Sequence, residues 1–147
     1  MRWSQCLILC ALFFCGCEKY YLSVKRERVS RERLASTFVG SPDPRQENPP
    51  KGQELILEWW LPKSAFQEHP DLVLKVIYKN HMQETVTYPL KRRRGVETFS
   101  LLGDKYRETG GLLTYKAEII GQNGAVIKEW KQLLWTDLIV IDDSSGK

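Results

Sequence analysis

Residues 53–62, QELILEWWLP, form the stretch that decides the fold. Leu55, Leu57 and Trp59 recur at every second position, and two glutamates occupy alternate positions. This period of two indicates a β-strand that buries one face and leaves the other against solvent. Pro62 has no backbone N–H to donate to a sheet, so it ends the strand. We therefore expect Trp59 to lie in the core of a β-sheet protein.

Further strand-like stretches follow, about 8 to 12 residues apart, to the end of the chain. Alternating or apolar runs predict strands at 72–79, 84–90, 96–101, 113–119, 125–130 and 133–141. Asn123-Gly124 predicts a tight hairpin turn, because both residues accept positive φ. Residues 103–111 are polar and turn-prone, and no stretch has a convincing helical period. The sequence thus predicts an all-β fold, an immunoglobulin-like antiparallel β-sandwich of about seven strands.

Two motifs resemble fibronectin type III domains. The first, Leu55-x-Leu57-x-Trp59-x-x-Pro62, is similar to the second strand of that family, in which a buried tryptophan follows two aliphatic residues. The second, Tyr115-x-Ala117-x-Ile119 followed by a turn at 121–124, is similar to the sixth strand and its hairpin. The resemblance covers residues 34–141. It implies a scaffold or binding module, although a fold does not by itself determine function.

The sequence also departs from that family's pattern. The usual Leu-x-Pro-x-Thr-x-Tyr corner is missing before Tyr115, where residues 109–114 read TGGLLT. The strand order within the immunoglobulin-like sandwiches therefore stays open. Residues 35–46, ASTFVGSPDPRQ, resemble the start of small uncharacterised lipoproteins of Chlamydia-like bacteria. That resemblance implies no particular chemistry.

The cysteines are confined to the beginning of the chain. All four lie within the first seventeen residues: Cys6, Cys10, Cys15 and Cys17. The rest of the chain has no thiol, which excludes a disulfide framework, a cysteine zinc site and a cysteine nucleophile from it.

Residues 1–16 have the order of an export signal: a basic residue, an apolar run, then a small residue. Residues 14–17, FCGC, resemble the lipobox of bacterial lipoproteins, with Phe14 and Cys15 departing from the usual residues. The resemblance implies removal of residues 1–16 and acylation of Cys17, with palmitate-like chains that anchor the protein. The alternative, a transmembrane signal anchor, needs roughly 20 apolar residues, about twice this run. We expect a lipoprotein of the cell envelope that faces the periplasm, in the inner or the outer membrane.

We expect a charged tether at 17–34, between the lipid and the sandwich. Its segment 25–33, KRERVSRER, has five basic and two acidic residues, a net charge of +3. The alternative for this segment is a basic patch on anionic lipid headgroups. The sandwich domain is then predicted at 35–147, with a proline-rich segment at 41–52 leading into it.

The sequence contains little that suggests catalysis. His69 and His81 have no partner at metal-ligand spacing, and no nucleophile elbow, phosphate-binding loop or zinc-protease motif occurs. We therefore expect no catalytic residue, no metal and no cofactor. The alternative, an enzyme acting on envelope polymers, needs carboxylates such as Glu97 and Glu118 in one pocket.

Four consecutive basic residues offer a candidate binding site: Lys91, Arg92, Arg93 and Arg94. Clustered positive charge attracts polyanions such as nucleic acid, lipopolysaccharide or a lipid surface. Alternatively, the cluster is a hairpin tip whose like charges discourage edge pairing. Residues 51–147 hold 14 basic and 13 acidic residues, a net charge of only +1, which argues against a nucleic-acid partner.

Three tryptophans, Trp60, Trp130 and Trp135, are candidates for an exposed aromatic patch, which would mark a partner surface. Alternatively, the proline-rich segment partly covers both sheet faces. The sequence thus predicts a lipid-anchored envelope protein whose non-catalytic sandwich binds or braces another envelope component, a protein partner being expected. A polyanion- or lipid-surface-binding module that uses residues 91–94 is the alternative, beside the enzyme.

Overall fold

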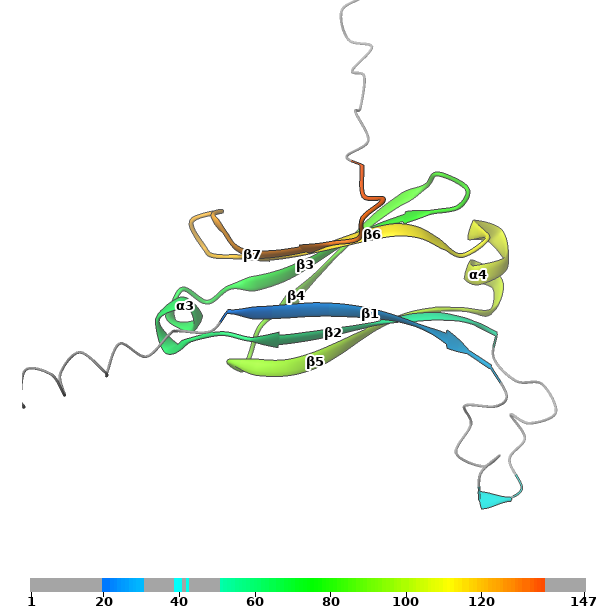
Figure 1. The fold of residues 1–147 in the computed structure, drawn as a ribbon, viewed down its shortest axis with the longest axis horizontal. Helices are drawn as coiled ribbons and strands as arrows, with labels where there is room; N and C mark the ends of the chain where they lie inside the picture. Colours follow the sequence, from blue (N-terminus) through cyan, green and yellow to red (C-terminus); the bar gives the residue numbers. More distant parts are fainter. Residues whose placement is uncertain (1–19, 31–38, 41, 43–50, 137–147) are drawn as a thin grey trace, which may run out of the picture.

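The computed structural model describes residues 20–30, 39, 40, 42 and 51–136 of the chain. Within this part the chain forms two antiparallel β-sheets that lie face to face (Figure 1). One sheet has the strand order β1-β2-β5, and the other has the order β4-β3-β6-β7. The predicted all-β sandwich is therefore confirmed, with seven strands among the described residues.

The strands lie close to where the sequence pattern predicts most of them. The three-stranded sheet consists of β1 (Tyr21–Val29), β2 (Gly52–Trp60) and β5 (Arg94–Leu102). The four-stranded sheet consists of β4 (Gln83–Pro89), β3 (Asp71–Tyr78), β6 (Leu112–Ile120) and β7 (Val126–Lys131). The predicted turn before β7 is also confirmed, because the N–H of Gly124 donates to the carbonyl of Gly121 at 2.9 Å.

The first strand corrects the predicted domain boundary. β1 lies within the predicted tether at 17–34, yet it pairs antiparallel with β2 along its whole length. Leu22 and Val24 lie opposite Trp59 and Leu57, and both are buried between the sheets. These two alternate aliphatic side chains give β1 an inward face, although the charged residues after them hide the pattern. The sandwich therefore includes residues 21–29, which the prediction assigned to the tether.

The predicted strand at 133–141 is wrong over the part that the structure describes. Leu133 and Leu134 lie in a turn after β7 and are exposed. The N–H of Trp135 donates to the carbonyl of Gln132 at 2.9 Å, a local bond that takes the chain out of the ladder. The rest of that prediction, 137–141, lies outside the described residues.

Two short helices are present where none is predicted: α3 (Lys63–Gln67) and α4 (Gly103–Thr109). α4 occupies most of the stretch predicted as a turn. Gly110 ends it in the left-handed conformation, with φ of 70°, a common way for a helix to stop. Helices of one or two turns are too short to leave a clear period in a sequence.

Trp59 is buried as predicted, with 7% of its surface exposed. Its indole lies against Gly95 of the neighbouring strand β5, and a Cβ on Gly95 would come within 2.6 Å of the ring carbon Cζ2. The indole Nε1–H donates to the carbonyl of Arg92 at 3.1 Å. Trp59 therefore holds the segment before β5 against the sheet.

α4 lies at the opposite end of the sandwich from α3 (Figure 1). There, a polar cluster ties α4 to the four-stranded sheet. The hydroxyl of Tyr78 donates to the carboxylate of Glu84, and the ammonium of Lys105 lies 2.8 Å from the same carboxylate. Burial, with the bond to Glu84, raises the pKa of Tyr78. Burial of Glu84 acts to raise its pKa, but hydrogen bonds from Lys105 and Tyr78 hold that pKa below the ordinary 4.5.

Candidate binding surface

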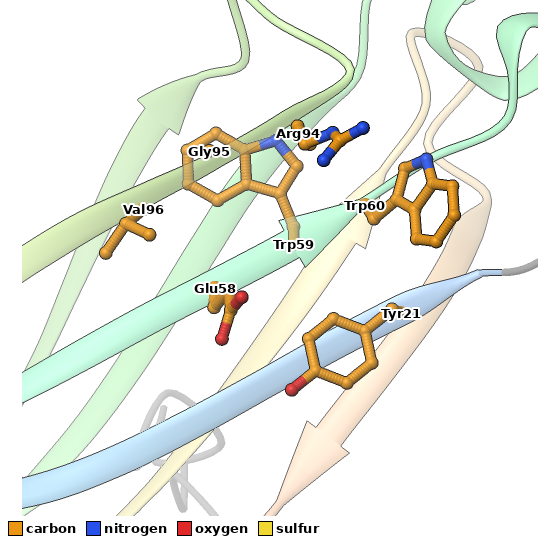
Figure 2. Close-up of a pocket in the computed structure, with 7 residues that line it drawn as sticks. All are labelled: Tyr21, Glu58, Trp59, Trp60, Arg94, Gly95 and Val96. Carbon is orange, nitrogen blue, oxygen red and sulfur yellow. The ribbon is translucent and has the colours of Figure 1, made fainter.

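Three strands bring an aromatic and basic row together at one end of the three-stranded sheet. Trp60, at the end of β2, pairs with Tyr21 at the start of β1 and with Arg94 at the start of β5. Because Trp59 points into the core, Trp60 points outward, and 40% of its surface is exposed. The guanidinium carbon of Arg94 lies 5.4 Å from the Trp60 ring centroid, within cation–π range. Figure 2 shows this row, with Trp59 lying across Gly95.

Two hollows meet at the start of β5. The first has a volume of about 280 Å³ and is lined by Tyr21, Glu58, Trp60, Arg94 and Val96, together with Trp59 and Gly95 (Figure 2). The second has a volume of about 380 Å³ and shares Trp59, Arg94, Gly95 and Val96 with the first. It adds Tyr88, Pro89, Lys91, Arg92 and Glu97. The predicted basic cluster and Trp60 thus border one continuous region.

The basic cluster crosses from one sheet to the other rather than forming a hairpin tip, because β4 and β5 belong to different sheets. Its backbone is held at two points: the N–H of Leu61 donates to the carbonyl of Arg93 at 2.7 Å, and Trp59 bonds that of Arg92. The Nε–H of Arg93 donates back to the carbonyl of Leu61 at 3.3 Å. The Arg93 side chain therefore helps to hold the fold together, whereas the side chains of Lys91, Arg92 and Arg94 are exposed. We name Tyr21, Trp60, Lys91, Arg92, Arg94 and Val96 the aromatic-basic surface.

The predicted patch of three tryptophans does not form. Trp130 lies on β7, in the other sheet, and stacks on Tyr115 with ring centroids 5.4 Å apart. It packs against the core rather than facing solvent, because it pairs with the inward-facing Ala117. Trp135 follows in the turn after β7 and is half-buried. Of these three tryptophans, only Trp60 lies beside the basic cluster.

Sequence reasoning missed Tyr21 and Tyr88. Tyr21 lies on β1, a strand that its charged residues conceal in the sequence. It could have been found only by recognising Leu22 and Val24 as the inward face of a strand. Tyr88 lies on the predicted strand β4, but its place beside the basic cluster depends on how the two sheets stack. Burial raises the pKa of Tyr88, and the negative charge of Glu97 adds to the rise.

The two carboxylates of the enzyme alternative lie in different sheets. Glu97 lines the second hollow from β5. Glu118 lies on β6, where it pairs with Lys75 at 3.1 Å and with Lys116 at 3.0 Å, and it lines neither hollow. These two residues therefore do not form the joint carboxylate pocket that the alternative requires.

The histidines are separate turn residues. His69 and His81 are exposed and have positive φ, 46° and 65°. Across the described ranges, no three histidine, cysteine, aspartate or glutamate side chains are grouped so as to hold a metal ion.

The predicted lipidation site, Cys17, lies outside the described residues. Among the residues that the structure does describe, no helix has the length and apolar character to cross a membrane. No protein family, no curated protein and no solved structure matches the chain.

Proposed function

We propose that this chain is a lipoprotein of a bacterial cell envelope, anchored through acyl chains on Cys17. Its sandwich contacts or braces another envelope component without catalysing a reaction, and the aromatic-basic surface is the part that makes this contact.

The start of β1 supports the proposed contact with the envelope, because it lies close to Cys17 in the sequence. β1 begins at Tyr21, so only residues 18–20 separate it from Cys17. Even fully extended, the four steps from Cys17 to Tyr21 span only about 14 Å. A lipid on Cys17 would therefore hold the sandwich close to the bilayer, whereas a long tether would let it reach far into the periplasm.

We further propose that the sandwich is immunoglobulin-like. Its fourth strand lies beside the third in the second sheet, whereas the immunoglobulin constant type has its fourth strand in the first sheet. This strand order is compatible with the fibronectin type III resemblance around Trp59. Domains of this kind act mostly as scaffolds and binding modules, which supports a non-catalytic role.

Labelling with a palmitate analogue tests the anchor. The wild-type chain should take up the label, lose residues 1–16 and stay in the membrane fraction. Cys17→Ala should take up no label and keep its leader, because cleavage of a lipoprotein signal follows acylation. Recovery of wild-type protein with an intact leader and an unmodified Cys17 thiol would contradict the proposal.

Site-specific photocrosslinking in the native envelope tests the contact surface. A photoreactive benzoylphenylalanine replaces Trp60 or, as a control, Met82, whose side chain is 60% exposed in the turn between β3 and β4. We expect crosslinks to an envelope component from position 60 and few from position 82. Equal yields from the two positions would show that the aromatic-basic surface makes no particular contact.

A further inference from the structure

The end of the sandwich that carries the aromatic-basic surface is positively charged. Three segments that join strands lie at this end, 61–70, 90–95 and 121–125, and together they contain five basic residues and one acidic residue, a net charge of +4. Among the described residues, no carboxylate lies within ion-pair distance of Lys91, Arg92 or Arg94. Glu58 lines the first hollow and Glu97 lines the second, and each offsets part of this charge. The remaining positive charge is available to an anionic partner.

The opposite end of the sandwich differs in this respect. There, Lys105 is paired with Glu84 and Arg107 with Asp104, so the cations of α4 have acidic partners on the chain itself. Lys51 and Lys79 are also exposed at the α4 end, but they lie far apart in the sequence. At the end where β1 begins, Lys91, Arg92 and Arg94 are exposed within four consecutive residues.

Exposed aromatic rings lie at the same end. Tyr20 and Trp60 are 39% and 40% exposed, and Tyr21 pairs with Trp60 across the strands. Tyrosine and tryptophan have an apolar ring and a polar atom, a combination that suits the boundary between headgroups and acyl chains. Arg94, held over the Trp60 ring, places a cation beside this aromatic group. Cations attract the phosphates of lipid headgroups, and aromatic rings suit the boundary just below those headgroups. An anionic lipid surface therefore matches both features of this end.

We propose that the aromatic-basic surface docks on the anionic phospholipid headgroups of the membrane that holds the chain. The inference rests on the proposed anchoring, because a lipid on Cys17 would bring this end of the sandwich to the bilayer first. The charge and the exposed rings, however, belong to the folded domain and do not depend on the lipid. Docking would turn the Tyr21–Trp60 end toward the membrane and the α4 end away from it.

Tryptophan quenching in nanodiscs tests the orientation. The protein is extracted from its membrane and reconstituted into discs of phosphatidylcholine, with or without phosphatidylglycerol, whose acyl chains carry bromine as a quencher. We expect stronger quenching on the discs with phosphatidylglycerol, and we expect the difference to fall as salt is added. Trp60→Phe should remove most of that difference.

Charge variants identify the surface responsible. Lys91→Ala with Arg92→Ala removes two exposed cations, which should shift the docking equilibrium by about tenfold or more. The matched control, Lys51→Ala with Lys79→Ala, removes two exposed cations from the other end and should leave quenching at the wild-type level. Circular dichroism of both double variants establishes that they are folded.

Several outcomes would overturn docking: equal quenching on neutral and anionic discs, equal loss in the control variant, or no contribution from Trp60. Binding to lipopolysaccharide or DNA without any response to phosphatidylglycerol would also overturn it, by assigning the surface to another polyanion. Mass spectrometry of Cys17 in the same sample separates the two proposals. If Cys17 is unmodified and the quenching still depends on lipid charge, only the lipid anchor is rejected. If Cys17 is acylated and the quenching does not depend on lipid charge, only docking is rejected.

Discussion

Gly95 and Trp59 face each other on β5 and β2, and each depends on the other. The absence of a side chain on Gly95 lets the indole lie flat across β5, and the indole in turn bonds the carbonyl of Arg92. The large core residue and the basic cluster are therefore linked through one glycine. The sequence indicated the burial of Trp59 through alternation. It could not indicate this glycine contact, because the register between strands some 35 residues apart decides it.

A methyl group at this position should be costly. Gly95→Ala places a Cβ within 2.6 Å of the Trp59 ring, so the indole or β5 must shift. We expect a loss of about 1 to 3 kcal/mol in the free energy of unfolding, measured by urea denaturation. Thr98→Ala, at an exposed position of the same strand, is the control and should change the stability much less. Equal stability of the two variants would mean that the close contact carries no strain.

At the scale of elements, α4 is held in place by polar contacts as well as by apolar burial. Glu84 of β4 receives hydrogen bonds from Tyr78 of β3 and from Lys105 of α4. The Lys105 ammonium also lies 5.6 Å from the ring centroid of Phe99 on β5. One carboxylate thus connects a helix to both strands of a hairpin, and that connection depends on its negative charge.

The stability of the protein should therefore depend on pH through Glu84. Because the pKa of Glu84 is lowered in the folded chain, its contribution is present above the ordinary value of 4.5 and is lost as pH falls through the lowered pKa. Glu84→Gln should be less stable than the wild type near neutral pH, and the difference should shrink in acid. Urea unfolding across this pH range measures it. Glu108→Gln, a change at an exposed position of α4, is the control and should change the stability much less near neutral pH.

The elements also show where sequence reasoning reached its limit. β2 and β3 were predictable because buried and less buried positions alternate over most of their length. β6 was predictable because Tyr115, Ala117 and Ile119 recur at every second position, although several residues between them are buried as well. β1 has only Leu22 and Val24 before its charges begin, and in a sequence this cannot be told from a solvated run. Leu133 and Leu134 led to the opposite error. Their apolar side chains predicted a strand, but a local turn takes them out of the sheet. Short patterns fail because tertiary pairing outweighs them.

At the scale of the whole molecule, the candidate surface is a product of topology. Trp60 and the basic cluster were both singled out from the sequence, but more than 30 residues separate them along the chain. They come together because β2 and β5 are neighbours in the sheet. Tyr21 joins them because β1 is a strand beside β2. Trp60 and the basic residues were therefore predictable from the sequence, whereas the place of Tyr21 and the meeting of these residues depend on the strand order.

Removal of β1 should disrupt the whole sandwich. A chain that begins at residue 31 loses the burial of Leu22 and Val24, about 1.5 to 3 kcal/mol for each, and uncovers the β2 edge. Typical domains have a total stability of about 5 to 15 kcal/mol, so we expect weak or absent cooperative unfolding. Thermal unfolding followed by circular dichroism should show a sharp transition for a chain that begins at residue 18. An equally sharp transition in the shorter chain would show that the sandwich does not need β1, and would favour the predicted tether for these residues.

The pairing of β1 with β2 also determines how the domain would bear a mechanical load. Nine residue pairs join the two strands, from Tyr21 opposite Trp60 to Val29 opposite Gly52. Tension on the N-terminus along the strand axis would shear all nine pairs at once, so they would share the force. Tension at right angles would peel them apart singly from Tyr21, at much lower force. A sandwich attached through this strand resists stretching along its length and yields to a sideways pull.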